Sequence, residues 1–280
     1  MTDSASTPRQ QWDHLREQIA LSTRLLVGFS GGADSALLAY AAHEVLGSAA
    51  VAATAVSASL PAAERSGAAD FCRRLGIAHV EVCTDELGRP EYARNGADRC
   101  FHCKSALFDA LEPLARMSGA DVAVGTNLDD LGSRYRPGQT AAAQRGVRRP
   151  LADAGLTKAD VRSVSAWLDL PSATKPAAAC LASRVAYGDR VTEAVLARIE
   201  AAEVAVHGLG FDTARVRSHA DGTVARVEVP AADLPRLLDL RGEVAAGVKA
   251  AGFTFCSLDL DGFRSGSMND LLTIGRAAVS

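Results

Sequence analysis

Residues 30–35 combine the side chains of an anion-binding loop. They read Ser-Gly-Gly-Ala-Asp-Ser and lie between an apolar run and a helical pattern. The glycines let backbone N–H groups approach an anion, the serine hydroxyls donate hydrogen bonds, and the helix N-terminus adds partial positive charge. Asp34 is a hard carboxylate beside the expected phosphates, which is the kind of ligand that Mg²⁺ prefers. The loop therefore predicts a phosphate site with a bound metal ion.

The motif differs from two other phosphate loops, since no lysine follows the glycines and the spacing is not G-x-G-x-x-G. It resembles the pyrophosphate loop (PP-loop) of the N-type ATP pyrophosphatases, which share an adenine nucleotide alpha-hydrolase-like fold. That resemblance implies ATP as cofactor, cleavage between its α and β phosphates, and transfer of AMP to an acceptor oxygen. The residues expected to hold ATP and Mg²⁺ are Ser30, Gly31, Gly32, Asp34 and Ser35.

Polar residues also end the neighbouring strands that the sequence predicts. Ligands of open α/β sheets bind beyond the carboxyl ends of the strands. Ser57 follows the predicted strand 50–56 and is placed to flank adenine. Gly125 and Thr126 end the fourth predicted strand, where they could serve ribose, the metal or the acceptor.

Three of the six cysteines lie in segments that the sequence predicts to be loops. Cys100 and Cys103 form a C-x-x-C at a helix start, which suits a redox pair, half a zinc site or half an iron–sulfur site. Cys180 lies between Lys175 and Arg184, and nearby positive charge favours the reactive thiolate. The other three lie in apolar periodic segments and are expected to be small core residues. They are Cys72, Cys83 and Cys256.

The elements that must position these residues alternate between strand and helix in the first half of the chain. Apolar runs and helical periodicity predict strands over 24–29, 50–56, 78–83 and 121–125 and helices over 11–19, 36–46, 62–75 and 101–117. This order predicts an α/β fold with a doubly wound parallel sheet. Later come helices 158–168, 192–207 and 234–250 and strands 214–218, 224–229 and 254–258. We expect a PP-loop domain over 1–184 and a smaller α+β domain over 185–280.

Composition excludes several classes of protein. The chain has 280 residues, of which 48% are hydrophobic, and 30 Lys and Arg stand against 33 Asp and Glu. The net charge of −3 leaves no excess to neutralise many phosphates, so binding of nucleic acid is not expected. No apolar run approaches the roughly 20 residues that span a bilayer, and residues 1–9 are unlike a signal peptide. We expect a cytoplasmic protein that contacts no membrane.

A narrower resemblance rests on four segments together. They are 29–35, 98–104, 180–184 and 258–269, the last reading Leu-Asp-Leu-Asp-Gly-Phe-Arg-Ser-Gly-Ser-Met-Asn. In these the chain resembles the ATP-dependent sacrificial sulfur transferases that help to make the nickel-pincer cofactor of lactate racemase (the LarE family). The match runs over nearly the whole chain. No physical reason for the last segment is visible in the sequence.

This resemblance implies a reaction and its residues. ATP would adenylate a carboxylate of pyridinium-3,5-dicarboxylate mononucleotide, and Cys180 would supply the sulfur and leave dehydroalanine. Some relatives instead bind a [4Fe–4S] cluster through three cysteines, and this chain has Cys100, Cys103 and Cys180, which favours the cluster form. Arg215 and Arg217 would share one face of a strand and suit a substrate phosphate. Glu200, Glu203 and Glu228 are weaker candidates for a metal ligand or base. The family also suggests a homo-oligomer.

Three other functions stay open at this point. An amidating synthetase of the NAD or GMP type shares the phosphate loop but needs an ammonia source, and no glutaminase segment is visible. A tRNA thiolation enzyme needs a basic surface, which the net charge disfavours. A nucleotide-binding regulator could hold structural zinc at the C-x-x-C. Exchange of pyrophosphate into ATP separates that regulator from all the enzymes.

Overall fold

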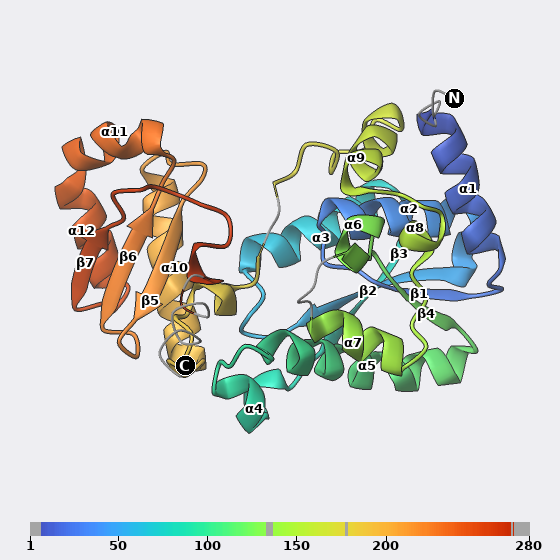
Figure 1. Cartoon of the computed structure of the whole chain (residues 1–280), viewed down its shortest axis with the longest axis horizontal. Coiled ribbons are helices and arrows are strands. Elements are labelled where there is room, and N and C mark those ends of the chain that lie inside the picture. The colour runs from blue at the N-terminus through green and yellow to red at the C-terminus, as the bar shows by residue number, and fades with distance from the viewer. Residues whose placement is uncertain (1–6, 133–136, 177–178, 270, 272–280) are drawn as a thin grey trace. The chain divides into compact units, whose positions relative to one another are not determined.

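The computed structural model describes residues 7–132, 137–176, 179–269 and 271, and it forms two compact units (Figure 1). The first unit comprises residues 1–85 and 100–178, and the second comprises residues 86–99 and 179–280. These units do not follow a single cut between residues 184 and 185. The segment 86–99, which lies between the predicted strand 78–83 and the predicted helix 101–117, belongs to the second unit and contains the short helix α4 (Pro90–Ala93).

The first unit is built on a four-stranded parallel sheet in the order β3-β2-β1-β4. The strands are β1 (Leu25–Gly28), β2 (Ala50–Val56), β3 (Ala78–Cys83) and β4 (Asp121–Val124). The expected α/β fold is therefore confirmed, and two of the four strands have the predicted bounds. Because β2 and β4 lie on opposite sides of β1, the chain reverses direction across the sheet there. This is the switch point at which open α/β sheets bind ligands.

Helices cover both faces of this sheet (Figure 1). One face packs against α1 (Pro8–Ala20), α2 (Ala33–Leu46), α3 (Ala62–Arg74), α8 (Pro150–Asp153) and α9 (Lys158–Trp167). The other packs against α5 (Arg99–Ser118) and α7 (Pro137–Gln144). Successive residues of a strand point to opposite faces, so Leu25 and Val27 join the first core and Leu26 joins the second. No helix within the described ranges is long and apolar enough to cross a membrane.

The starts of two helices position residues 30–35 and Lys158. Helix α2 begins at Ala33, directly after its N-cap Gly32, and not at the expected Ala36. Asp34 therefore lies in the first turn of α2 instead of in a free loop. Helix α9 begins as predicted after Thr157, whose hydroxyl accepts from the backbone N–H of Asp160 in a capping box.

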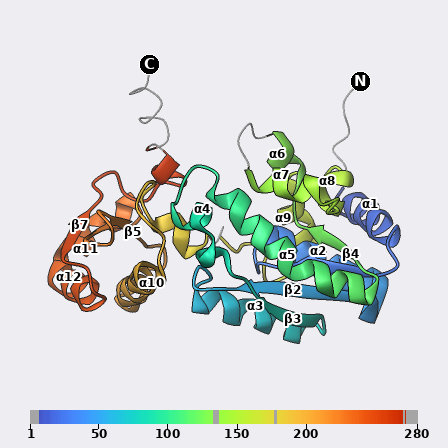
Figure 2. The same cartoon turned by 90° about the horizontal axis from the view of Figure 1, so that it is seen from below.

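The second unit is a three-stranded sheet with helices on one side (Figure 2). Strands β5 (Arg215–His219) and β6 (Val224–Glu228) pair antiparallel, and β7 (Phe255–Leu258) pairs parallel with β6. Helix α10 (Glu193–Gly208) packs on β5 and α12 (Arg241–Ala250) packs on β7. The single helix expected over 234–250 is divided at Leu240 into α11 (Leu234–Asp239) and α12. The rest of this α+β unit follows the predicted order.

The three cysteines expected in the core differ in their surroundings. Cys72 on α3 is 1% exposed, and burial raises the pKa of its thiol to about 11. Cys256 is half-buried, and burial raises the pKa of its thiol as well. Cys83 is exposed at the end of β3, so the expectation of a core residue is wrong there.

Alkylation should separate these thiols. The thiolate is the reactive form, so at pH 8 a thiol with a pKa of about 11 is ionised in only about one molecule in a thousand. We expect iodoacetamide to modify Cys83 within minutes and to leave Cys72 unmodified until the protein is denatured. Peptide mapping by mass spectrometry gives the extent at each site. Equal modification of both cysteines in the native protein would contradict the burial of Cys72.

Candidate active site

The loop after β1 is held in shape by its own serines. Gly31 has a φ of +71°, a conformation that favours glycine. The hydroxyl of Ser35 donates to the carbonyl of Gly32 at 3.1 Å and accepts from the backbone N–H of Ser30 at 3.2 Å. The hydroxyls of Ser30 and Ser35 are themselves 3.1 Å apart. Ser35 thus fastens the loop, while Ser30 is exposed and faces solvent.

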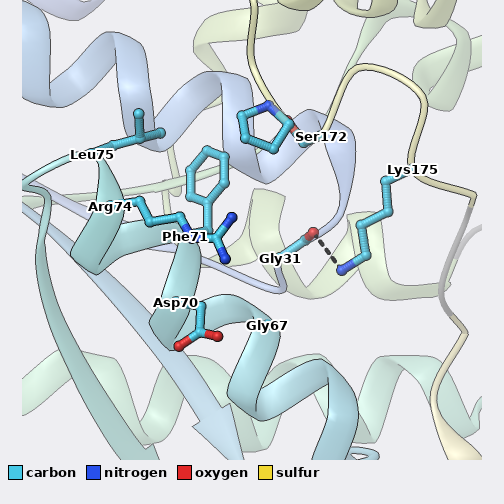
Figure 3. Close-up of a pocket in the computed structure, with 9 residues that line it drawn as sticks. Gly31, Gly67, Asp70, Phe71, Arg74, Leu75, Ser172 and Lys175 are labelled. Carbon is cyan, nitrogen blue, oxygen red and sulfur yellow. Dashed lines mark hydrogen bonds between the residues drawn. The ribbon is translucent and has the colours of Figure 1, made fainter.

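A lysine far along the chain supports the same loop. Lys175 Nζ donates to the carbonyl oxygen of Gly31 at 3.0 Å and pairs with Glu64 of α3 at 2.7 Å. Figure 3 shows Lys175 reaching Gly31 beside a cavity of about 260 Å³, whose wall includes the ring of Phe71 and the hydroxyl-bearing Ser172. The sequence had suggested Lys175 as a cation beside Cys180. In the structure its ammonium binds the PP-loop instead.

The side chain of Asp34 connects the loop to two distant segments of the chain. Its Oδ1 accepts from Asn127 Nδ2 at 3.1 Å, and its Oδ2 accepts from Lys158 Nζ at 2.5 Å. Asn127 follows β4 and Lys158 opens α9, so three segments meet at this carboxylate. The side chain of Asp34 is 24% exposed and that of Lys158 is 36% exposed, which keeps the pair accessible from solvent.

Gly125 brings the loop after β4 into backbone contact with the PP-loop. A Cβ atom at this position would lie 2.8 Å from the backbone nitrogen of Ser35 and 2.9 Å from the carbonyl carbon of Asp34. Real Cβ atoms do not approach backbone so closely, and neither backbone atom can rotate away. Gly125 was expected to contact the nucleotide. Its position in the structure indicates that it also permits the approach of Asn127 to Asp34.

The other two expected nucleotide contacts lie at the same edge of the sheet. Thr126 is 5% exposed, and its hydroxyl donates to Gln139 Oε1 of α7 at 3.2 Å. Ser57 is half-buried after β2, where its hydroxyl accepts from the backbone N–H of Ser59 at 3.2 Å. Both follow the carboxyl ends of their strands, as predicted.

Asp34 suits a magnesium ion that arrives with phosphate. Mg²⁺ in nucleotide enzymes is held by one or two carboxylates together with phosphate oxygens and water. Asp34 offers one such carboxylate beside a loop that binds anions through N–H groups. In the described part of the chain, no group of three or more His, Cys, Asp or Glu side chains is gathered around one metal position.

Cys180 lies in the second unit, where a buried arginine holds its backbone. It precedes a short 3₁₀ helix, Leu181–Arg184, and its side chain is half-buried. Arg184 Nη1 donates to the carbonyls of Ala179 and Cys180, the second at 2.8 Å, and Ser183 Oγ donates to the Cys180 carbonyl at 2.7 Å. Glu203 of α10 accepts from Arg184 Nε at 3.0 Å. Arg184 therefore fixes the main chain at Cys180, and its charge is balanced by Glu203.

Arg215 and Arg217 share a strand face but have different partners. Arg217 is 6% exposed and pairs at 2.8 Å with Glu228, which is fully buried. Arg215 lies over the ring of Phe263 and donates to the carbonyl of the preceding residue. Burial, and then the nearby charge of Arg184, lowers the pKa of the Arg215 guanidinium. Arg215 is thus a half-buried cation near both guanidinium and carboxylate groups, whereas Arg217 is paired directly with Glu228.

The segment 258–269, unexplained from the sequence, lies along the polar face of this second sheet. Asp259 pairs with Arg226 of β6 at 3.0 Å. Ser267 Oγ donates to Glu228 Oε1 at 2.9 Å. Phe263 of the same segment lies beside Arg215. The segment 258–269 therefore contacts three charged side chains of this sheet, Arg215, Arg226 and Glu228. The side chain of the segment's last residue, Asn269, lies outside the described residues.

The C-x-x-C pair begins helix α5 in the first unit. Cys100 is exposed and Cys103 is half-buried, and neither forms a disulfide. Residues three apart on a helix lie on the same face, so the two sulfurs project from one side of the first turn. Cys180, the third cysteine of the expected set, belongs to the second unit.

Sequence reasoning missed two cations of the first unit. Lys158 was expected only as the start of a helix, yet it binds Asp34. The helical periodicity located that helix start, but no sequence signal linked it to residues 30–35. Lys175 was noted only for its nearness to Cys180 in sequence, and its contact with Gly31 spans 144 positions.

One family model matches the N-terminal part of this chain, and two known proteins match nearly all of it. A sequence model of the NAD synthase family matches residues 10–90, which include the PP-loop. An uncharacterized protein of Synechocystis sp. is 41% identical over 264 residues, which cover 93% of this chain and 97% of that protein. The pyridinium-3,5-bisthiocarboxylic acid mononucleotide synthase of Lactiplantibacillus plantarum is 35% identical over 257 residues, which cover 91% and 92% of the two chains.

Replacing Gly125 by Ala should weaken nucleotide binding. The added methyl would collide with the backbone of Ser35, and overpacking of this kind costs about 1–3 kcal/mol or displaces the loop. We expect calorimetric titration with a non-hydrolysable ATP analogue to give at least about a tenfold weaker affinity. Gly132→Ala, where none of the described atoms lies within 4 Å of the added methyl, is the control. Unchanged affinity in both variants would show that the close approach is not needed.

Replacing Glu203 by Gln should destabilise the second unit. Arg184 and Glu203 have side chains that are 4% and 9% exposed, and removing one partner of a buried pair costs about 3–5 kcal/mol. Urea denaturation should show this loss, whereas Glu243→Gln on the exposed side of α12 should change stability by less than about 0.5 kcal/mol. If the two variants unfold at the same urea concentration, the Arg184–Glu203 pair does not support the Cys180 segment.

Proposed function

This chain belongs to the family of the pyridinium-3,5-bisthiocarboxylic acid mononucleotide synthase, and we propose that it is an ATP-dependent sulfur transferase. Its substrate is pyridinium-3,5-dicarboxylate mononucleotide, and its product serves nickel-pincer cofactor synthesis. The family resemblance drawn from the four sequence segments is confirmed by the identity over 91% of the chain. The observation that carries the proposal is that one chain contains both a PP-loop with Asp34 and a cysteine whose backbone Arg184 holds.

The first unit supports the activation step. The N–H groups of the PP-loop hold the ATP phosphates, and Asp34 contributes to the site of Mg²⁺, which neutralises charge on the phosphates. A carboxylate oxygen of the substrate attacks the α-phosphorus, the bond to the bridging oxygen breaks, and pyrophosphate leaves with the electron pair. The product is an acyl-adenylate. Ser57 and Thr126 are the proposed neighbours of the adenosine at the edge of the sheet.

The second unit supports sulfur delivery. In the sacrificial form, Cys180 Sγ attacks the acyl carbon of the adenylate and AMP leaves, which gives a thioester. Loss of the Cα proton with cleavage of the Cβ–S bond then leaves dehydroalanine at position 180 and a thiocarboxylate on the substrate. Arg184 fixes the backbone at this cysteine, and Arg215 is the proposed contact for the substrate phosphate.

The cluster form uses the same residues differently. Three thiols, two of them in a C-x-x-C, are a donor set that suits an iron–sulfur cluster with one open iron. Cys100, Cys103 and Cys180 are at least partly exposed, and none of them forms a disulfide. A [4Fe–4S] cluster held by them would supply sulfide, and no residue would be consumed. Iron and sulfide analysis after anaerobic purification distinguishes the forms, with about four irons per chain in the cluster form.

Compartment and assembly belong to the proposal as well. None of the six cysteines, all of which the structure describes, forms a disulfide, which accords with the reducing cytoplasm. We retain the family's suggestion of a homo-oligomer, which light scattering of the purified protein tests.

An amidating synthetase is the second candidate, because the NAD synthase family matches residues 10–90. That match covers the PP-loop but not the segments that contain Cys100, Cys103 and Cys180. Ammonia-dependent formation of AMP and an amide from a carboxylated nucleotide would favour this function over sulfur transfer.

Two variants test the proposed steps separately. Asp34→Ala should abolish pyrophosphate release, because the metal and the PP-loop lose their carboxylate. Cys180→Ala should release pyrophosphate in a single turnover but form no thiocarboxylate. Mass spectrometry of the nucleotide and a pyrophosphate assay measure the two outcomes. Thiocarboxylate formation by the Cys180 variant, or normal pyrophosphate release by the Asp34 variant, would remove that residue from its role.

A further inference from the structure

The ion pair between Asp34 and Lys158 occupies the carboxylate that the proposed reaction needs for its metal. Lys158 Nζ lies 2.5 Å from Asp34 Oδ2, and Asn127 takes the other oxygen. The ammonium competes with a divalent ion for this carboxylate, because the two positive charges repel each other at Oδ2. Binding of the metal at Oδ2 is therefore favoured when the side chain of Lys158 moves away from Asp34.

The backbone of Lys158 is fixed, so only its side chain can move. Lys158 is the first residue of α9, and the Thr157 capping box holds that helix start. Its backbone N–H also donates to Asp129 Oδ2 at 2.8 Å. A lysine is a point charge on a flexible four-carbon stem. Released from Asp34, the ammonium stays within reach of the PP-loop, where the ATP phosphates are the strongest new anions.

We propose that Lys158 is an exchangeable counterion, paired with Asp34 in the nucleotide-free protein and with ATP phosphate once the metal has taken Asp34. This inference rests on the proposed use of ATP and Mg²⁺ at the PP-loop. A metal ion that binds without nucleotide displaces the ammonium of Lys158 from Asp34 and offers it no new anion. A metal ion that binds together with ATP also brings phosphate groups, which accept hydrogen bonds from that ammonium. The ion pair therefore couples the two ligands, so that each improves binding of the other.

Manganese binding tests the exchange without any turnover, since Mn²⁺ is a paramagnetic probe that occupies Mg²⁺ sites. With no nucleotide present, Lys158→Met should bind Mn²⁺ about threefold to fivefold more tightly than the wild-type protein, because the competing ammonium is gone. With a non-hydrolysable ATP analogue present, the same variant should bind about tenfold more weakly, because a phosphate contact is gone. Titration followed by electron paramagnetic resonance gives both affinities.

Two controls make the result specific. Lys158→Arg keeps the charge and should keep the weak binding of Mn²⁺ in the absence of nucleotide. Lys249→Met removes an exposed lysine of α12 and should leave Mn²⁺ affinity unchanged. Unchanged or weaker nucleotide-free binding in Lys158→Met would overturn the exchange. A protein that shows the exchange but forms no thiocarboxylate would instead overturn the proposed function, so the two failures are distinguishable.

Discussion

The close approach of two backbone segments at Gly125 is the constraint on which the nucleotide site depends. β1 and β4 are parallel neighbours at the switch point of the sheet, so the loops after them lie side by side. Only a residue without a Cβ lets these loops touch. The same approach brings Asn127 to one oxygen of Asp34, and the start of α9 brings Lys158 to the other. The proposed site for a phosphate and a metal is thus assembled from segments far apart in the chain.

The second unit follows a different physical rule, in which buried charges must be paired. Arg217 and Glu228 lie on one sheet face and are nearly inaccessible to water, and an unpaired charge there would be strongly destabilising. The segment 258–269 supplies further polar partners to this face. Arg215 lies half-buried beside this face, near guanidinium and carboxylate groups, and it is the proposed contact for a substrate phosphate. The backbone at Cys180 is held by a neighbouring pair of the same kind, Arg184 and Glu203.

Local patterns predicted the architecture well and the contacts between distant segments poorly. The strand over 50–56 and the helix after Thr157 follow from hydrophobic periodicity and capping, which act over a few residues. The PP-loop was recognisable because its chemistry is contiguous. Lys158 was missed because its contact with Asp34 spans 124 positions, and side-chain partners at that distance leave no periodic signal. Cys83 was wrongly placed in the core because an edge strand and an inner strand share the same pattern.

The central claim is that this chain uses ATP to activate a carboxylate of a pyridinium nucleotide. Exchange of radiolabelled pyrophosphate into ATP measures that step directly, because exchange requires a reversible adenylation. We predict that exchange needs both Mg²⁺ and pyridinium-3,5-dicarboxylate mononucleotide. We also predict that exchange is lost when this substrate is replaced by a nucleotide without a carboxyl group. Exchange that proceeds equally well without the carboxylated nucleotide, or that requires tRNA in its place, would contradict it.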